Sequence, residues 1–240
     1  MSLQIDIPIR YLLAPILIWQ GLRIRRTALI LPEADGPRSG VSGSGADLRL
    51  LILGDSSAAG VGAAHQKDAL SGQLTARLAQ RFAVDWTLIA RTGATSKDAL
   101  TMLGGARETP FDVALIALGV NDVTRGVSVA RFIKRQSAIC QHLRQEHGVR
   151  RIIVTGLPPL GSFPALSPLL QWILGAQAGR MDARLQDWIQ TQPDCSYLGF
   201  DLPLEADLMA SDGFHPNVRT YALWAEAAAN RIASVLAPEF

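Results

Sequence analysis

Cysteine and net charge are both scarce in this chain of 240 residues, and each shortage excludes a class of protein. Two cysteines, Cys140 and Cys195, are too few for a disulfide scaffold and are wrongly spaced for a zinc site. The formal net charge is +2, and the arginines are scattered except at Arg23, Arg25 and Arg26. No face is then basic enough to follow a phosphate backbone. We expect two buried thiols in a reducing compartment and no nucleic-acid partner.

The sequence also lacks a hydrophobic stretch long enough to cross a bilayer. The apolar run over residues 11–19 is too short to span one. A secretory signal would carry positive charge before such a run and small residues at a cleavage site after it. Here most of the charge follows the run and no such site closes it, so we expect a segment that is not a removed leader.

Residues 8–26 are nevertheless apolar and basic, and two interpretations stay open for them. In the first, the segment is a helix whose apolar face docks on its own domain or on a second subunit. In the second, it is an interfacial helix with Trp19 and the arginines at the headgroup level of a membrane. The expected location is cytoplasmic, with peripheral attachment to the inner face of the membrane under the second interpretation.

The segment that follows has the composition of a connector. Residues 31–47 contain Pro32, Pro37 and four glycines with little apolar content, which is typical of an extended linker. We therefore divide the chain into an N-terminal helical segment with its connector, residues 1–47, and a main domain over residues 48–240.

In the main domain, short apolar runs alternate with longer helical patterns. Strands are expected over residues 48–54, 84–90, 113–118, 151–155 and 195–200, and helices over 68–82, 96–103, 129–143, 169–189 (as one or two helices) and 218–236. The run at 48–54 is typical of a strand that is buried on both faces of a parallel sheet. The alternation predicts an α/β fold with a doubly wound parallel sheet of about five strands.

Polar residues that directly follow the strands are the first candidates for a functional site, because ligands bind beyond the carboxyl ends of parallel strands. Four such segments carry candidate chemistry: Gly54-Asp55-Ser56-Ser57, Arg91-Thr92-Gly93-Ala94, Gly119-Val120-Asn121-Asp122 and Asp212-Gly213-Phe214-His215. We expect all four to meet at one rim of the domain.

Three of these residues have the chemistry of a serine nucleophile and its base. A serine hydroxyl needs a base to remove its proton, and the base needs a carboxylate to hold its tautomer. Asp212 and His215 are three residues apart in a glycine-containing turn, so they can form this pair locally. Ser56 must then be brought to them by the fold.

Acyl transfer also requires hydrogen-bond donors aimed at the oxyanion that develops on the substrate. The backbone amides of Ser56 and Gly93 and the side-chain amide of Asn121 can supply three such donors. Glycine at position 93 leaves room for the substrate oxygen to approach closely.

Taken together, the four segments resemble the four motif blocks of the SGNH (GDSL-type) hydrolase family, in order and spacing. The likeness runs from about residue 48 to the end of the chain. It implies a flavodoxin-like three-layer α/β/α sandwich, no metal or other cofactor, and hydrolysis of esters or thioesters through an acyl-enzyme. It also implies Ser56 as the nucleophile, Asp212 and His215 as the acid-base pair, and Ser56, Gly93 and Asn121 as the oxyanion donors.

Neighbouring polar residues are expected to be structural. Asp55 and Asp122 lie in strand-to-helix turns, where aspartate commonly accepts hydrogen bonds from backbone amides. Ser57 is interpreted in the same way. The remaining histidines have no ligand pattern near them and are expected on the surface; they are His65, His142 and His147.

The apolar, proline-containing loop over residues 157–172 is the candidate wall of an acyl pocket, with Phe163, Leu166 and Leu169 as substrate contacts. The alternative is that these side chains only cap the core. If the loop is the pocket wall, the substrate is a small-molecule ester with a short to medium acyl chain.

Three other functions stay open from the sequence. An acyltransferase to an alcohol or sugar would use the same residues but exclude water, and a thioesterase would use them on a different leaving group. A non-catalytic binding module is the third, although such a module would be expected to have lost Ser56, His215 or Asn121.

Overall fold

The computed structural model describes residues 9, 12–27, 29–105, 110–199 and 206–236. Its central feature is a six-stranded sheet in the order β1-β3-β2-β4-β5-β6. All neighbouring strands are parallel except β1, which pairs antiparallel with β3 at one edge. The strands are β1 (Ser39–Ser42), β2 (Ala46–Gly54), β3 (Phe82–Ala90), β4 (Val113–Ala117), β5 (Arg151–Thr155) and β6 (Cys195–Leu198).

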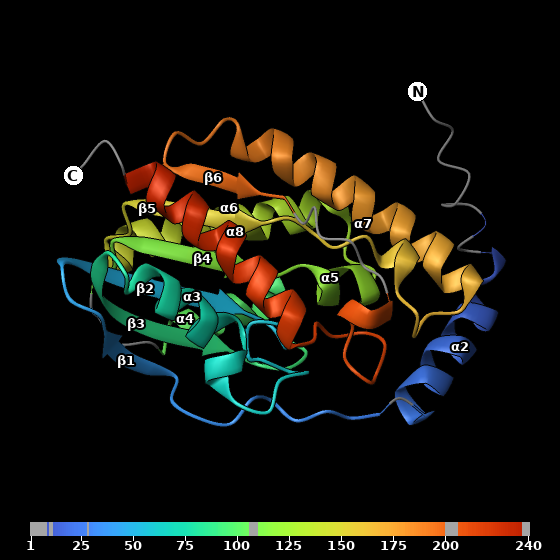
Figure 1. The fold of residues 1–240 in the computed structure, drawn as a ribbon. Helices are drawn as coiled ribbons and strands as arrows, with labels where there is room; N and C mark the ends of the chain where they lie inside the picture. The colour runs from blue at the N-terminus through green and yellow to red at the C-terminus, as the bar shows by residue number, and fades with distance from the viewer. Residues whose placement is uncertain (1–8, 10–11, 28, 106–109, 200–205, 237–240) are drawn as a thin grey trace.

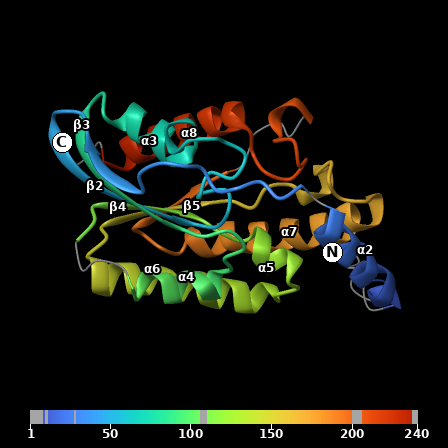
Figure 2. The same cartoon turned by 90° about the horizontal axis from the view of Figure 1, so that it is seen from below.

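The five parallel strands have the order of a flavodoxin-like sheet, so the predicted fold class is confirmed, with six strands rather than about five. Helices cover both faces of the sheet, as Figures 1 and 2 show. On one face lie α3 (Leu70–Leu78) and α8 (Val218–Leu236); on the other lie α4 (Ser96–Leu103), α5 (Val120–Thr124), α6 (Val129–His147) and α7 (Pro168–Ile189).

The core therefore has two halves, one on each side of the sheet. In β2, Leu50 and Ile52 belong to the half under α3 and α8, while Leu51 and Leu53 belong to the other half. All four side chains are fully buried, which is the reason that this strand has a continuous apolar run.

The helix expected over residues 68–82 is shorter than predicted. A short 3-10 turn at Gln66–Asp68 precedes α3, which ends at Leu78, and Phe82 begins β3 instead of ending the helix. Every second residue of β3 from Phe82 is buried, so Phe82 belongs to a strand pattern with a period of two. Its apolar character alone could not distinguish the two elements.

The predicted connector contains the edge strand β1, which the sequence analysis missed. Its four residues are at most half-buried, and the exposed fraction of Val41 reaches 72%. The strand is held by main-chain pairing with β3 instead of by buried side chains. Composition alone therefore could not reveal it. The boundary near residue 47 stays a prediction.

Other expected elements agree closely with the structure. The closing helix is found as predicted, α6 continues four residues further to His147, and α7 is a single helix that begins at Pro168. Strand β6 ends at Leu198, and residue 200 lies outside the described part of the chain. Both cysteines are free thiols; Cys140 is buried, but Cys195 is only half-buried because it begins the edge strand β6.

The N-terminal helix α2 (Ala14–Thr27) lies beside the beginning of α7 at one end of the molecule, as both ribbon views show. Leu17 packs against the core, and the Ser167 hydroxyl donates a hydrogen bond of 2.9 Å to Gln20 Oε1. None of the helices in the described ranges is long and apolar enough to cross a membrane.

Candidate active site

Ser56 lies two residues beyond the carboxyl end of β2, in a tight turn. The Ala59 amide donates to the Asp55 carbonyl at 2.9 Å, and the Val61 amide donates to the Ser56 carbonyl at 3.0 Å. These bonds hold the backbone of Ser56 at the rim of the sheet, where its side chain meets His215. The serine is largely buried but lines a pocket.

His215 connects Ser56 to Asp212. Its Nε2 atom is 2.9 Å from Ser56 Oγ, and its Nδ1 atom is 2.5 Å from Asp212 Oδ2. The structure thus brings together the three residues that the sequence analysis singled out for nucleophilic chemistry. With a carboxylate on Nδ1, the proton of neutral imidazole stays on that atom, and Nε2 is left to accept a proton from the serine.

The turn between Asp212 and His215 positions the carboxylate. Asp212 Oδ1 accepts the backbone amides of Phe214 and His215, both at 3.0 Å. Gly213 has a φ of +64°, a conformation that glycine adopts without strain. Burial raises the pKa of Asp212, but hydrogen bonds from the His215 ring and from the two amides outweigh it and hold that pKa below its usual value. Asp212 is therefore ionised at neutral pH.

The expected oxyanion donors come from three segments: the turn after β2, the loop after β3, and the first turn of α5. Gly93 has a φ of +75°, and its carbonyl accepts a hydrogen bond of 2.8 Å from Arg125, which fixes the loop. Asn121 Nδ2 donates to the Ala94 carbonyl at 3.1 Å and to Asp55 Oδ2 at 3.3 Å. Among the hydrogen bonds of the described residues, none uses the backbone amide of Ser56 or Gly93.

The two aspartates predicted to be structural do accept backbone amides. Asp55 accepts the amide and hydroxyl of Ser57 at 3.0 and 2.8 Å, and burial raises the pKa of Asp55. Asp122 accepts the amide and hydroxyl of Ser96 at 2.8 and 2.7 Å and pairs with Arg135 at 3.0 Å. Asp122 therefore connects α4 and α6 to α5, the short helix that carries Asn121.

One predicted surface histidine is in the core. His65 is exposed and His142 is half-buried, but only 3% of His147 is exposed. Its ring packs against Phe111, with 6.1 Å between the ring centroids, because the end of α6 folds onto the start of β4.

In the described ranges, no three His, Cys, Asp or Glu side chains are grouped so that they could hold a metal ion.

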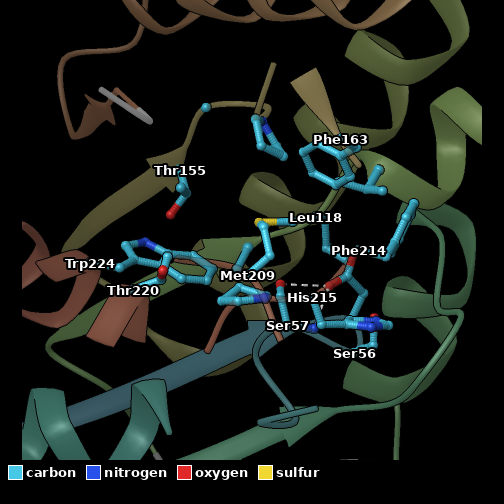
Figure 3. Close-up of a pocket in the computed structure, with 16 residues that line it drawn as sticks. Ser56, Ser57, Leu118, Thr155, Phe163, Met209, Phe214, His215, Thr220 and Trp224 are labelled. Carbon is cyan, nitrogen blue, oxygen red and sulfur yellow. Dashed lines mark hydrogen bonds between the residues drawn. The ribbon is translucent and has the colours of Figure 1, made fainter. Parts of the chain in front are cut away.

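A pocket opens beside Ser56 and His215 and extends toward α8 (Figure 3). Most of its lining is apolar and includes Leu118, Phe163, Met209, Phe214 and Trp224. Polar side chains also reach it, among them Thr155 and Thr220. The cavity volume is about 50 Å³.

Of the three predicted substrate contacts, Phe163 lines this pocket and the other two do not. Leu166 is buried in the core on the α7 side of the sheet, and Leu169 is half-buried in the first turn of α7. Within this loop the pocket is lined by Pro158 and Phe163, which lie on either side of the 3-10 turn Leu160–Ser162. Sequence reasoning missed Met209 and Trp224, although Phe214 stands inside the motif that was singled out.

Comparison with known proteins identifies the family of this chain. The model of the GDSL-like Lipase/Acylhydrolase family matches residues 52–223. The chain belongs to this family. The match includes every residue of the Ser56, His215 and Asp212 constellation, as well as Gly93 and Asn121.

One relative of this GDSL-like chain is the GDSL-like esterase Rv1075c of Mycobacterium tuberculosis. The two sequences are 30% identical over 200 residues, which make up 75% of this chain. This chain spans 60% of the length of that relative.

Solved structures of low sequence identity share the fold. The esterase EstA of Pseudoalteromonas sp. is 20% identical with a TM-score of 0.60, and the match covers 79% of this chain and 99% of EstA. A carbohydrate acetylesterase family member from Sinorhizobium meliloti is 17% identical with a TM-score of 0.59, over 79% of this chain and 99% of its own.

Proposed function

We propose that this GDSL-family chain is a serine hydrolase that cleaves carboxylic esters through an acyl-enzyme on Ser56. The observation that carries the proposal is the continuous contact from Ser56 Oγ through the His215 ring to Asp212, with distances of 2.9 and 2.5 Å. Family membership and the esterase name of the Mycobacterium relative support the same reaction.

In the proposed reaction, Ser56 Oγ attacks the ester carbonyl carbon while its proton moves to His215 Nε2. The tetrahedral intermediate then collapses, and the imidazolium donates that proton to the departing alkoxide. A water molecule repeats the two steps on the acyl-enzyme and releases the carboxylic acid. Asp212, whose pKa is held low, stabilises the imidazolium each time it forms.

The intermediate's oxyanion would be bound by the amides of Ser56 and Gly93 and by Asn121 Nδ2. One Asn121 hydrogen is held by the Ala94 carbonyl, which orients the side chain. The second points toward Asp55 across 3.3 Å, a long hydrogen bond, so this is the hydrogen that can turn to an oxyanion. Such preorganised donors stabilise the charge that develops in the transition state.

The size of the pocket favours acyl chains from the short end of the expected short to medium range. A buried water needs roughly 10–15 Å³ by this measure, so 50 Å³ holds a chain of only a few heavy atoms. Longer chains would have to displace lining side chains or extend into solvent.

A chain-length series of 4-nitrophenyl esters tests the acyl pocket. We expect kcat/KM to be highest for short acyl groups and to fall at least about tenfold by a twelve-carbon chain, because each methylene outside the pocket loses its burial. Phe163→Ala should move the optimum toward longer chains, since Phe163 lines the pocket. Leu166→Ala, which removes a side chain that does not line it, should leave the optimum in place. A flat series would contradict the acyl assignment.

For the N-terminal helix, we propose that α2 attaches the protein to an anionic membrane surface. One face of α2 rests on the protein through Leu17 and Gln20, while the other presents Ile16, Ile18 and Trp19 to solvent. The exposed fractions of Ile18 and Trp19 are 61% and 58%. This pattern supports an interfacial helix, in which the apolar face enters the headgroup region.

Charge favours a membrane over a second copy of the chain as the occupant of this face. The sequence of α2 contains three arginines and no acidic residue, and the guanidinium of Arg23 lies 5.6 Å from the centre of the Trp19 ring. Anionic lipid attracts such a cluster, whereas side-by-side helices of two copies would place like charges near each other. A tryptophan at this boundary is suited to the headgroup level.

Co-sedimentation of the full chain with vesicles of phosphatidylglycerol and phosphatidylcholine tests this attachment. The double variant Ile18→Ser, Trp19→Ser should bind on the order of 10- to 100-fold more weakly, because it removes two apolar side chains from the interface. Val41→Ser, which changes an exposed valine on β1, should bind as the wild type does. If the double variant binds the vesicles as tightly as Val41→Ser does, the proposal is contradicted. If the wild type sediments as a dimer and the double variant as a monomer, the exposed face of α2 is instead a self-association surface.

A further inference from the structure

The pocket beside Ser56 contains a buried hydroxyl group whose hydrogen-bonding capacity is unused. Thr155 lines the pocket with an exposed fraction of 2%, and its Oγ1 atom has no hydrogen-bond partner among the residues that the structure describes. A buried hydroxyl without a partner destabilises the folded protein, so such groups are uncommon. At the end of a strand that borders a substrate pocket, a ligand is the natural source of the missing partner.

The other hydroxyls of the pocket interior are already engaged. Ser57 Oγ donates to Asp55 at 2.8 Å, and Thr220 Oγ1 donates to the Leu208 carbonyl. Most of the remaining lining is apolar. The Thr155 hydroxyl is thus a polar position with spare capacity in surroundings that otherwise suit hydrocarbon.

The position of Thr155 in the sheet explains why its hydroxyl reaches the pocket. It is the last residue of β5, and side chains alternate along a strand, so it shares a face with Ile153, which packs in the core half under α8. In Figure 3 the Thr155 hydroxyl points toward the space beside Trp224, and Ser56 and His215 lie at the opposite side of the pocket.

We propose that Thr155 hydrogen-bonds an oxygen atom carried by the acyl group, so that the enzyme prefers short acyl chains with a hydroxyl, ether or keto oxygen over plain chains of equal length. The inference rests on the proposed esterase function. We place the acyl group of the ester at the buried end of the pocket, because the alcohol must leave to solvent while the acyl group stays on Ser56. A plain chain there would cover the Thr155 hydroxyl and leave it unpartnered, and sites with buried polar groups reject substrates that lack the matching atom.

Two esters of nearly equal size test the inference. 4-Nitrophenyl methoxyacetate and butanoate have the same number of non-hydrogen atoms, and only the first has an ether oxygen in its acyl chain. Thr155→Val removes the hydroxyl at nearly constant volume. We expect the ratio of kcat/KM for methoxyacetate over butanoate to fall about fivefold in this variant, the effect of one hydrogen bond between uncharged groups. An unchanged ratio would overturn the inference and would assign the hydroxyl to a bound water.

Two controls isolate the hydroxyl. Thr155→Ser keeps the donor and should keep the wild-type ratio, and Met209→Leu alters an apolar lining residue and should change the two rates together. Comparing ratios within each variant cancels the different intrinsic reactivity of the two esters.

Binding of the free acids to the wild-type chain provides a second measurement that needs neither a variant nor turnover. Methoxyacetate should bind more tightly than butanoate in a calorimetric titration, and equal or weaker binding would overturn the inference. Absence of hydrolysis of both esters would instead overturn the proposed function, so the two failures are distinguishable.

Discussion

Replacement of Ser56 by alanine is expected to lower kcat for 4-nitrophenyl butanoate by about 10⁶-fold and to abolish covalent labelling by a fluorophosphonate probe. The size of the effect follows from the role of Oγ as the atom that bonds to the acyl carbon, since removing a serine nucleophile costs on the order of this factor. Stopped assays of the two chains, with labelling followed by intact-protein mass spectrometry, would measure it.

The adjacent serine provides the matched control. Ser57 differs from Ser56 in that its hydroxyl donates to Asp55 and has no contact with the His215 ring among the hydrogen bonds of the described residues. Ser57→Ala should retain labelling at Ser56. Labelling that persists in Ser56→Ala, or that is lost only in Ser57→Ala, would assign the nucleophile to another residue.

Replacement of Asp212 by asparagine is expected to lower kcat by about 10⁴-fold with little change in the fold. The substituted amide still offers an oxygen to the backbone amides of Phe214 and His215, which Asp212 Oδ1 accepts at 3.0 Å. Its NH₂ group, however, would donate to His215 Nδ1 and shift the ring proton to Nε2, the atom that must accept the serine proton. The serine would then face a donor instead of a base.

Steady-state kinetics and circular dichroism of Asp212→Asn would test this, with Asp207→Asn as the control. Asp207 is also in the loop before α8, but its side chain is more than half exposed and pairs with Arg219 at 3.1 Å. The control variant should keep its activity. A loss of less than about tenfold in Asp212→Asn would show that Asp212 does not orient His215.

The same carboxylate has a defined pH behaviour. Because the pKa of Asp212 is depressed in the folded chain, Asp212 stays ionised as the pH falls below its ordinary titration range. Its favourable contribution to stability is fully present above the unfolded pKa and is lost only as the pH falls through the lower folded value. Protonation of Asp212 therefore does not account for activity that is lost on mild acidification.

The sequence by itself was sufficient for features that depend on neighbours in the chain. The strand β2 was predictable because a strand buried on both faces must be apolar throughout. The pairing of Asp212 with His215 was predictable because three residues and one glycine turn bring them together. The family resemblance likewise rested on short local motifs, and residues 52–223 match the family model.

Tertiary structure decided the contacts between distant segments. Ser56 and His215 are 159 residues apart, and only the parallel sheet brings the ends of β2 and of the loop before α8 to one rim. The same holds for Thr155, whose hydroxyl is notable only because Trp224 and the pocket surround it. Composition could not assign β1 either, because an edge strand held by main-chain hydrogen bonds needs no particular side chains. The local sequence pattern determines which side chains have the chemistry to react, and tertiary packing determines which of those side chains come into contact.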